Sequence, residues 1–314
     1  MVVGSIERFA VDAAGLRVEG LRDGKGPPLV LLHGFPQTSH EWRHVIGPLS
    51  ATRMVVAPDQ RGFGRTAKPY PPRMSRTLLA RDLEATLDAL GLEIIDLAGH
   101  DWGGAVASTF AFRRPDRVRR LVLIDTTIER VVLRASWHLL WFKIPRLAER
   151  SFATQAEEFV RGGLVGLSKT PGVPSEDDLE HYVSGFRDPS THATAISLYR
   201  HALPVFRVRE DERAQERFER ISAAEIRAAW GAGVGNHPLW DEVVSLAPLM
   251  RRKRFPKPTL WIYASALGRP NAAFRAQFVR AFPELETREL DCGHWIPEER
   301  PAELVALLEA FLSA

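Results

Sequence analysis

The chain has 314 residues, of which 45% are hydrophobic and 26% are charged, as is ordinary for a folded soluble protein. Its formal net charge of +3, from 42 basic and 39 acidic residues, indicates no class of partner. The densest basic run, residues 251–254, has no aromatic stacking pattern beside it, which favours a solvated face over a nucleic-acid site.

The single cysteine and the N-terminal residues exclude further classes. One cysteine, Cys292, rules out an intramolecular disulfide framework and a two-cysteine metal site. The first ten residues, MVVGSIERFA, hold both an acid and a base and no long apolar run. We therefore expect no signal peptide, no membrane span of about 20 apolar residues and a cytoplasmic location.

Strand patterns run through most of the chain. The stretches IERFAVD and LRVEGLRDG predict an antiparallel hairpin at the edge of a sheet. Continuous short apolar runs then predict strands buried on both faces, as in a parallel sheet. These runs are LVLLHG (29–34), RMVVAPD (53–59), IIDLAG (94–99), RLVLID (120–125) and TLWIYA (259–264).

Helical patterns fill the gaps between these strands. Residues 75–90 have apolar spacings of three and four, begin at Ser75 and stop at Gly91. Residues 104–112 and 301–313 are also expected to be helical, the second starting with Pro301 in its first turn. Strand–helix alternation of this kind implies right-handed crossovers and a doubly wound, mostly parallel α/β sheet.

The alternation stops between about 127 and 255. SWHLLWFKIP, TQAEEFVRGGL, SEDDLEHYVSGF and THATAISLYRHAL read as short helices separated by Pro and Gly. We interpret 127–255 as a helical cap inserted into a core made of residues 1–126 and 256–314. Residues 205–255 form a charged extension that suits either a larger substrate pocket or a homodimer contact.

The stretch AGHDWGG (98–104) places Asp101 at the end of a predicted strand and the start of a helix. Gly99, Gly103 and Gly104 flank it, and a nucleophile in a strained strand-to-helix turn needs such small neighbours. The amide of Trp102 would then point at the reacting centre from a helix N-terminus. The alternative is an ordinary tight turn in which Asp101 only caps the helix.

Other motifs also follow predicted strands. The loop HGFP (33–36) is placed to supply an oxyanion amide from Phe35, with His33 holding the loop and Pro36 suited to a cis bond. DQRGFG (59–64) follows the next strand. His294, in CGHWIPEERP, follows the last strand and can reach a nucleophile at Asp101, because active groups in open α/β sheets gather at the carboxyl ends of strands.

This motif set, HGFP … DQRGFG … GHDWGG … GHW, resembles the α/β-hydrolase fold enzymes of the branch that contains epoxide hydrolases, haloalkane dehalogenases and haloacetate dehalogenases. The resemblance covers nearly the whole chain. It implies that Asp101 is a nucleophile that forms an alkyl ester, that His294 activates the water that hydrolyses it, and that the Phe35 and Trp102 amides hold the oxyanion. It implies no metal and no organic cofactor.

The acid partner of His294 departs from the family's common pattern. In this branch the acid often follows the strand that here reads TLWIYASALGRPN, and that turn has no Asp or Glu. Some members place the acid after the preceding sheet strand, which assigns Asp125 here as the group that orients the imidazole. Glu129 is the reserve, and the alternative for Asp125 is a strand-end cap.

The cap residues decide between substrates. By resemblance, Tyr199 in SLYRHA and His138 in SWHLLWFKIP correspond to the pair of cap donors, which can give a proton or hydrogen bond to the leaving group. Such a His/Tyr pair occurs in some epoxide hydrolases and also in haloacetate dehalogenases. The alternative is that both only pack within the cap. Haloacetate dehalogenases carry arginines where this chain has Trp102 and Ala105. The expected substrate pocket contains His33, Trp137, Trp141 and Trp295.

We therefore predict an enzyme that opens a small apolar organic epoxide to a vicinal diol. A dehalogenase that uses Asp101 and His294 is the first alternative, because Trp102 also matches a halide ligand of haloalkane dehalogenases. A non-catalytic ligand-binding protein that keeps the fold is the second. A serine esterase is the weakest alternative, since the chain has no G-x-S-x-G motif.

Overall fold

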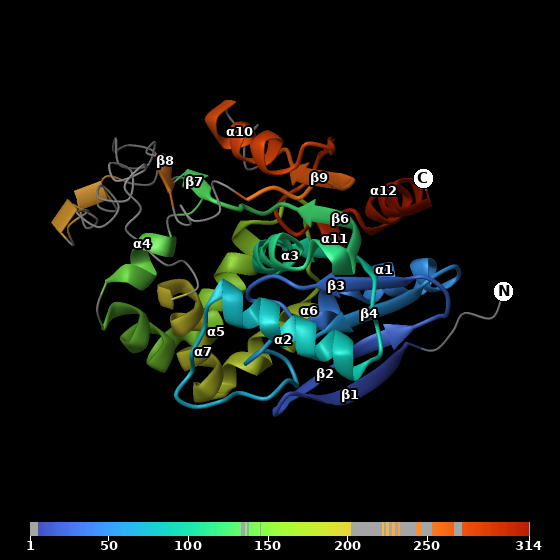
Figure 1. Cartoon of the computed structure of the whole chain (residues 1–314). Coiled ribbons are helices and arrows are strands. Elements are labelled where there is room, and N and C mark those ends of the chain that lie inside the picture. The colour runs from blue at the N-terminus through green and yellow to red at the C-terminus, as the bar shows by residue number, and fades with distance from the viewer. Residues whose placement is uncertain are drawn as a thin grey trace.

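The computed structural model describes residues 6–132, 136, 138–144, 146–201, 222, 224–225, 228–229, 232, 243–245, 253–266 and 272–313. An eight-stranded sheet in the order β1-β2-β4-β3-β5-β6-β9-β10 forms its centre (Figure 1). The strands are β1 (Glu7–Ala13), β2 (Leu16–Asp23), β3 (Pro28–Leu32), β4 (Met54–Pro58), β5 (Ile95–His100), β6 (Val118–Ile124), β9 (Thr259–Ala264) and β10 (Leu285–Leu290).

The sheet confirms the predicted strands and hairpin. β1 pairs antiparallel with β2, and β2 pairs antiparallel with β4, whereas every pair from β4 to β10 is parallel. All six residues of β5 and of β9 are buried, which explains why both strands are mostly apolar. The buried Asp96 of β5 pairs with Arg53 and Arg119. The chain has the doubly wound, mostly parallel α/β sheet that the sequence predicted.

Helices cover both faces of the sheet. They are α1 (Arg43–Ser50), α2 (Arg76–Ala89), α3 (Trp102–Arg113), α10 (Ala272–Ala281), α11 (Ile296–Glu299) and α12 (Pro301–Ser313), with the 3₁₀ turns η1 (Ser39–Trp42) and η2 (Pro115–Arg117). Leu31 of β3 packs into the apolar cluster of α1 and α12, whereas Leu32 packs into that of α2 and α3. This alternation follows from the two-residue period of a strand. Helices α1 and α10 were not predicted.

The segment between β6 and β9 is largely helical. It contains β7 (Arg130–Val132), α4 (His138–Lys143), α5 (Leu147–Gly166), α6 (Glu176–Ser184), the 3₁₀ turn η3 (Gly185–Arg187), α7 (Pro189–His201) and β8 (Val243–Ser245). β7 pairs antiparallel with β8. Helices α4, α5 and α7 lie at the end of the molecule away from both chain termini (Figure 1).

These helices confirm four predicted helical stretches and correct the bounds of one. Helix α5 begins at Leu147, before the expected start at Thr154, because a non-helical Gln155 (φ −142°) joins two helical pieces. Most of the charged extension 205–255 lies outside the described residues. The boundaries proposed for a cap at 127 and 255 stay a prediction.

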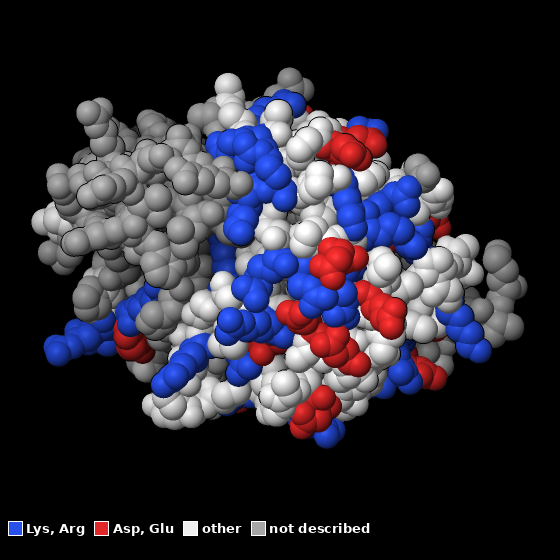
Figure 2. Space-filling view, in the orientation of Figure 1, with Lys and Arg blue, Asp and Glu red and all other residues white. Residues whose placement is uncertain are grey.

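Charged side chains are intermixed over the described surface. Figure 2 shows Lys and Arg lying among Asp and Glu along the middle of one face. Among the described ion pairs, Arg114 pairs with Glu84 and Asp116, and Arg117 pairs with Asp88 at 2.9 Å. In the described part of the chain, no helix has both the length and the apolarity that a membrane span requires.

Candidate active site

Asp101 stands on a strained turn between β5 and α3. Its backbone has φ 47° and ψ −118°, a conformation that is costly for a residue with a side chain. Its amide donates to the Ile124 carbonyl of the neighbouring strand at 3.1 Å. A Cβ on Gly99 would lie 2.4 Å from the Gly103 carbonyl carbon, and one on Gly103 would lie 2.1 Å from the Leu32 carbonyl oxygen. The glycines therefore allow the close strand–helix approach that the sequence predicted.

The loop after β3 grips the Asp101 carboxylate. The Phe35 amide donates to Oδ2 of Asp101 at 2.9 Å. A Cβ on Gly34 would lie 2.8 Å from Cβ of Asp101, so the loop can approach only with glycine there. The Phe35–Pro36 peptide is cis, as predicted. The amide of Trp102 is at the first position of α3, and its part in an oxyanion site stays a prediction.

His33 connects this loop to the loop after β4 through hydrogen bonds. Its Nε2 accepts a hydrogen bond from the Gln60 amide at 2.9 Å, so Nδ1 carries the proton and donates to the Gly34 carbonyl at 2.8 Å. The side chain is 1% exposed. Because protein partners occupy both ring nitrogens, His33 has no polar atom left for the substrate-pocket role that we predicted.

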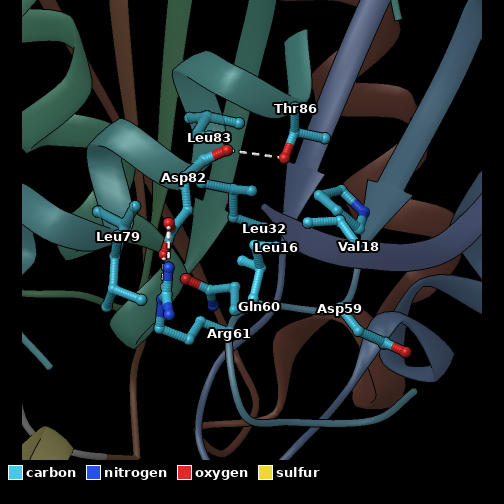
Figure 3. A pocket seen from close by; sticks show the side chains of 12 residues that line it. Leu16, Val18, Leu32, Asp59, Gln60, Arg61, Leu79, Asp82, Leu83 and Thr86 are labelled. Atoms are coloured by element: carbon cyan, nitrogen blue, oxygen red, sulfur yellow. Dashed lines mark hydrogen bonds and ion pairs between the residues drawn. The ribbon is translucent and has the colours of Figure 1, made fainter. Parts of the chain in front are cut away.

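The DQRGFG loop braces His33 in turn. Arg61 forms a two-pronged ion pair with Asp82 of α2, with both N–O distances at 2.6 Å. Figure 3 shows this pair and Gln60 at a small pocket between β2, β4 and α2. That pocket contains none of the residues predicted for the site. The DQRGFG loop therefore holds the loop after β3 in place through Gln60 and His33.

His294 lies between two carboxylates. Its Nδ1 is 2.5 Å from Oδ2 of Asp125, and its Nε2 is 3.9 Å from Oδ1 of Asp101. The first distance is a hydrogen bond in which Nδ1–H donates, which leaves a lone pair on Nε2 facing Asp101. The second distance is too long for a direct hydrogen bond but suits an intervening water. The chain thus brings together nucleophile, base and acid candidates from three strand ends.

Asp125 is fixed by the neighbouring strand. Its Oδ1 accepts a hydrogen bond from the Ala264 amide at 3.1 Å, and its own amide donates to the Ile262 carbonyl at 2.8 Å. The resemblance places the acid of many members after β9. In this chain the end of β9 instead supplies the Ala264 amide, which donates to Asp125. Glu129, the reserve acid, instead forms an ion pair with Arg280 of α10 and does not contact His294.

The sequence did not predict a buried pair, His100 and Glu41, next to the Asp101 turn. Nε2 of His100 donates to the His294 carbonyl at 2.9 Å, and Nδ1 lies 3.2 Å from Oε2 of Glu41. Both side chains are fully buried. Burial lowers the pKa of His100, but the charge of Glu41 and the bond to it outweigh that effect and raise the pKa to about 9. Burial also raises the pKa of Glu41, so the pair retains a proton, which these shifts favour on His100. His100 also anchors the loop that holds His294.

Tyr199 of α7 is enclosed by aromatic rings near Asp101. Its ring stacks on Phe142, with ring centres 4.1 Å apart. The rings of Phe35 and Trp102 lie nearly perpendicular to it, with ring centres 5.1 and 5.2 Å away. Burial, followed by the negative charge of Asp101, raises its pKa well above the usual 10, while a side-chain hydrogen bond with Trp102 lowers it. The hydroxyl keeps its proton at neutral pH and feels the charge of Asp101.

His138 lies beside Tyr199, with ring centres 5.3 Å apart. Burial lowers the pKa of His138 to about 4, although Asp101 raises it. The imidazole is therefore neutral above pH 5 and keeps one N–H donor. The structure thus places the two donors predicted from sequence next to each other.

The remaining predicted pocket residues differ in their surroundings. Trp141 of α4 is partly buried and stacks on Phe159 at 4.7 Å. Trp295 is 1% exposed and its indole donates to the Leu164 carbonyl at 2.6 Å, so its polar atom is occupied. Trp137 lies outside the described residues. Within the described part of the chain, no three His, Cys, Asp or Glu side chains are grouped so as to hold a metal ion.

The chain belongs to the alpha/beta hydrolase fold family, whose model matches residues 27–301. It is 32% identical over 248 residues to the soluble epoxide hydrolase of Corynebacterium sp. (strain C12), covering 73% of this chain and 83% of that protein. It is also 33% identical over 199 residues to the fluoroacetate dehalogenase of Burkholderia sp., covering 59% of this chain and 65% of that protein.

A solved structure shares the fold. Epoxide hydrolase CorEH without ligand matches with a TM-score of 0.77 at 23% identity, over 98% of this chain and 99% of that one. At that identity the likeness shows the fold alone. The family and its relatives make this chain a hydrolytic enzyme of the epoxide hydrolase and dehalogenase type.

Proposed function

We propose that the chain hydrolyses an organic epoxide to a vicinal diol through an ester on Asp101. The observation that carries this proposal is the pair of uncharged donors, Tyr199 and His138, adjacent to each other and within the electrostatic reach of Asp101. Epoxide opening generates an alkoxide, which such donors stabilise and protonate. A halide ion needs no proton.

The first step is nucleophilic attack. Oδ1 of Asp101 attacks one ring carbon, the carbon–oxygen bond of that carbon breaks, and the electron pair stays on the oxygen. Tyr199 and His138 donate hydrogen bonds to this oxygen, which takes the proton of the Tyr199 hydroxyl, and the tyrosinate regains a proton from solvent. The product is a hydroxyalkyl ester of Asp101. Because the Phe35 amide already holds Oδ2 at 2.9 Å, Oδ1 is the oxygen left free to attack.

The second step is hydrolysis of the ester. Nε2 of His294 removes a proton from water, whose oxygen attacks the carboxyl carbon of Asp101. Asp125 stabilises the imidazolium through Nδ1, at 2.5 Å. The Phe35 amide stays on Oδ2, where negative charge develops. The Cγ–Oδ1 bond of Asp101 then breaks and the imidazolium gives its proton to Oδ1, which leaves in the diol. The new carboxyl group, which carries one oxygen from water, loses its proton and restores the carboxylate.

Dehalogenation is the alternative that one relative supports, because a fluoroacetate dehalogenase is among the similar proteins. Two positions weigh against a haloacid. The residues one and four positions after Asp101 are Trp102 and Ala105, neither of which can pair with a carboxylate. The Trp102 ring also packs edge-on against the Tyr199 ring, with ring centres 5.2 Å apart.

The test is a single turnover of styrene oxide in ¹⁸O-labelled water, with chloroacetate and 1-chlorobutane assayed beside it. We expect unlabelled diol from the first turnover, with the label entering Asp101, and no halide release. Label in the diol on that turnover would exclude the ester route. Halide release without diol formation would assign the dehalogenase activity instead.

A further inference from the structure

The two donors lie on different helices, separated by more than fifty residues of chain. His138 begins α4, and Tyr199 lies near the end of α7. Helix α4 has only six residues, too few to be stable without tertiary contacts. The placement of His138 over the site therefore depends on what fastens α4 to α7.

One face of α4 meets Tyr199. His138 and Phe142 are four residues apart, so their side chains lie on the same side of the helix. His138 meets the Tyr199 ring edge-on at 5.3 Å, and Phe142 stacks on it at 4.1 Å with an interplanar angle of 6°. Any shift of α4 along α7 would disturb both contacts at once.

Arg200, the residue after Tyr199, fastens this arrangement from the other side. Its Nε donates to the Phe142 carbonyl at 2.9 Å, and Nη2 reaches the Ile144 carbonyl at 3.4 Å. The Phe142 carbonyl lies in the last turn of α4, where carbonyls lack partners within the helix. Ile144 directly follows the helix, and its carbonyl also accepts from the Leu147 amide at 3.3 Å. Nη1 and Nη2 also bind the Glu149 carboxylate of α5, at 2.5 and 2.9 Å.

We propose that Arg200 is a positioning residue that caps α4 and thereby holds His138 and Phe142 against Tyr199 for ring opening. The proposal rests on the epoxide-opening function above. The partners of Arg200 are Phe142, Ile144 and Glu149 and do not include Asp101, so we assign it an action through the two donors. It therefore serves the first chemical step and has no part in ester hydrolysis, which uses His294 and Asp125.

The test measures both steps with styrene oxide by rapid quench and intact mass, in Arg200→Met and Arg200→Lys. In Arg200→Met we expect ester formation to slow by about 10- to 100-fold, the cost of misplacing reacting groups by about 1 Å. Hydrolysis of the ester once formed stays within about twofold. Arg200→Lys keeps one donor and is expected to fall between. Ester formation within twofold of the unchanged protein, or equal slowing of both steps in either variant, would overturn the proposal.

Two controls separate positioning from general damage. Glu149→Gln removes the charged partner of Arg200 but leaves the bond to the Phe142 carbonyl, so both steps are expected within about twofold. In a double-mutant cycle, Arg200→Met and Tyr199→Phe together should slow ester formation by less than the product of their separate effects. Full additivity would show that Arg200 does not act through Tyr199. Failure of the unchanged protein to open styrene oxide would refute the proposed function instead.

Discussion

The Asp125 carboxylate lies 2.5 Å from Nδ1 of His294, and the residue that carries it has a left-handed backbone, with φ 39°. Asp101 has a similar φ of 47°. The two residues follow β5 and β6, whose last residues, His100 and Ile124, are partners in the sheet. Strained conformations persist where their surroundings hold them firmly, and here they aim two carboxylates at one imidazole.

Replacing Asp125 by Asn tests its assignment as the acid. The amide cannot hold the tautomer that presents the Nε2 lone pair, so ester hydrolysis should fall by about 10⁴-fold. Ester formation should change little, because that step uses Asp101 and the donors. Rapid-quench mass spectrometry would show the ester accumulating.

Glu129→Gln is the matched control for this prediction. Its buried carboxylate pairs with Arg280, so its loss should lower the free energy of unfolding by about 1–3 kcal/mol. Turnover should stay within about threefold. If Glu129→Gln abolished turnover and Asp125→Asn did not, the reserve assignment would be the right one.

His294→Ala is expected to stop the reaction at the ester. Nε2 is the group in the described site that faces Asp101 with a free lone pair, at 3.9 Å, so without it no base activates the water. Intact mass after exposure to styrene oxide should rise by the mass of one epoxide. Asp101→Asn in the same background should show no such increase, and an adduct there would move the nucleophile elsewhere. An adduct that forms in His294→Ala and is lost with Asp101→Asn would also exclude a non-catalytic binding protein.

Much of the core and the site could be predicted because strand ends converge. Apolar runs with no polar interruption identified the buried strands, and the residues just after them, Asp101 and Asp125, had to lie side by side. Helix α1 was missed for a physical reason. Gly47 and Pro48 disfavour a helix interior, and the helix forms because Val45, Ile46 and Leu49 are fully buried.

The partners of individual histidines could not be predicted. The chain has ten histidines, and sequence alone does not show which of them is paired with a buried carboxylate. Glu41 lies 59 residues from His100 along the chain, and the fold alone places its carboxylate 3.2 Å from the ring. A signal did exist, since His100 ends a fully buried strand directly before Asp101. Without the fold, that signal names no partner.

Tyr199→Phe should slow ester formation by about 10²-fold or more, since general acid assistance contributes at this level. The raised pKa of Tyr199 and the lowered pKa of His138, about 4, keep both donors uncharged from pH 6 to 9. Titration of the donors should therefore add no inflection to the rate of ester formation in that range. Tyr182→Phe is the control, because that buried hydroxyl donates to Glu298 and has no place in the chemistry. Equal losses in the two variants would show that Tyr199 matters only for packing.

The pH dependence of stability should have a maximum near pH 6.5. His100 has a pKa of about 9 in the folded protein against an ordinary value of 6.5, so its contribution is complete below pH 6.5 and is lost as pH rises through 9. Burial lowers the pKa of His138 and of His181 to about 4. Between pH 6.5 and 4 the unfolded chain binds protons that the folded protein does not, so stability falls as pH falls.

Two variants assign these opposite slopes to their residues. His100→Gln should remove the decline in the free energy of unfolding between pH 6.5 and 9, even if its overall stability is lower, because the titrating group is gone. His181→Gln should instead make the acid side less steep, with the part due to His138 remaining, and leave the alkaline side unchanged. Denaturant unfolding at half-unit steps from pH 5 to 9 measures both. An alkaline slope that persists in His100→Gln would mean that the Glu41–His100 pair does not carry the charge inferred from its burial and geometry.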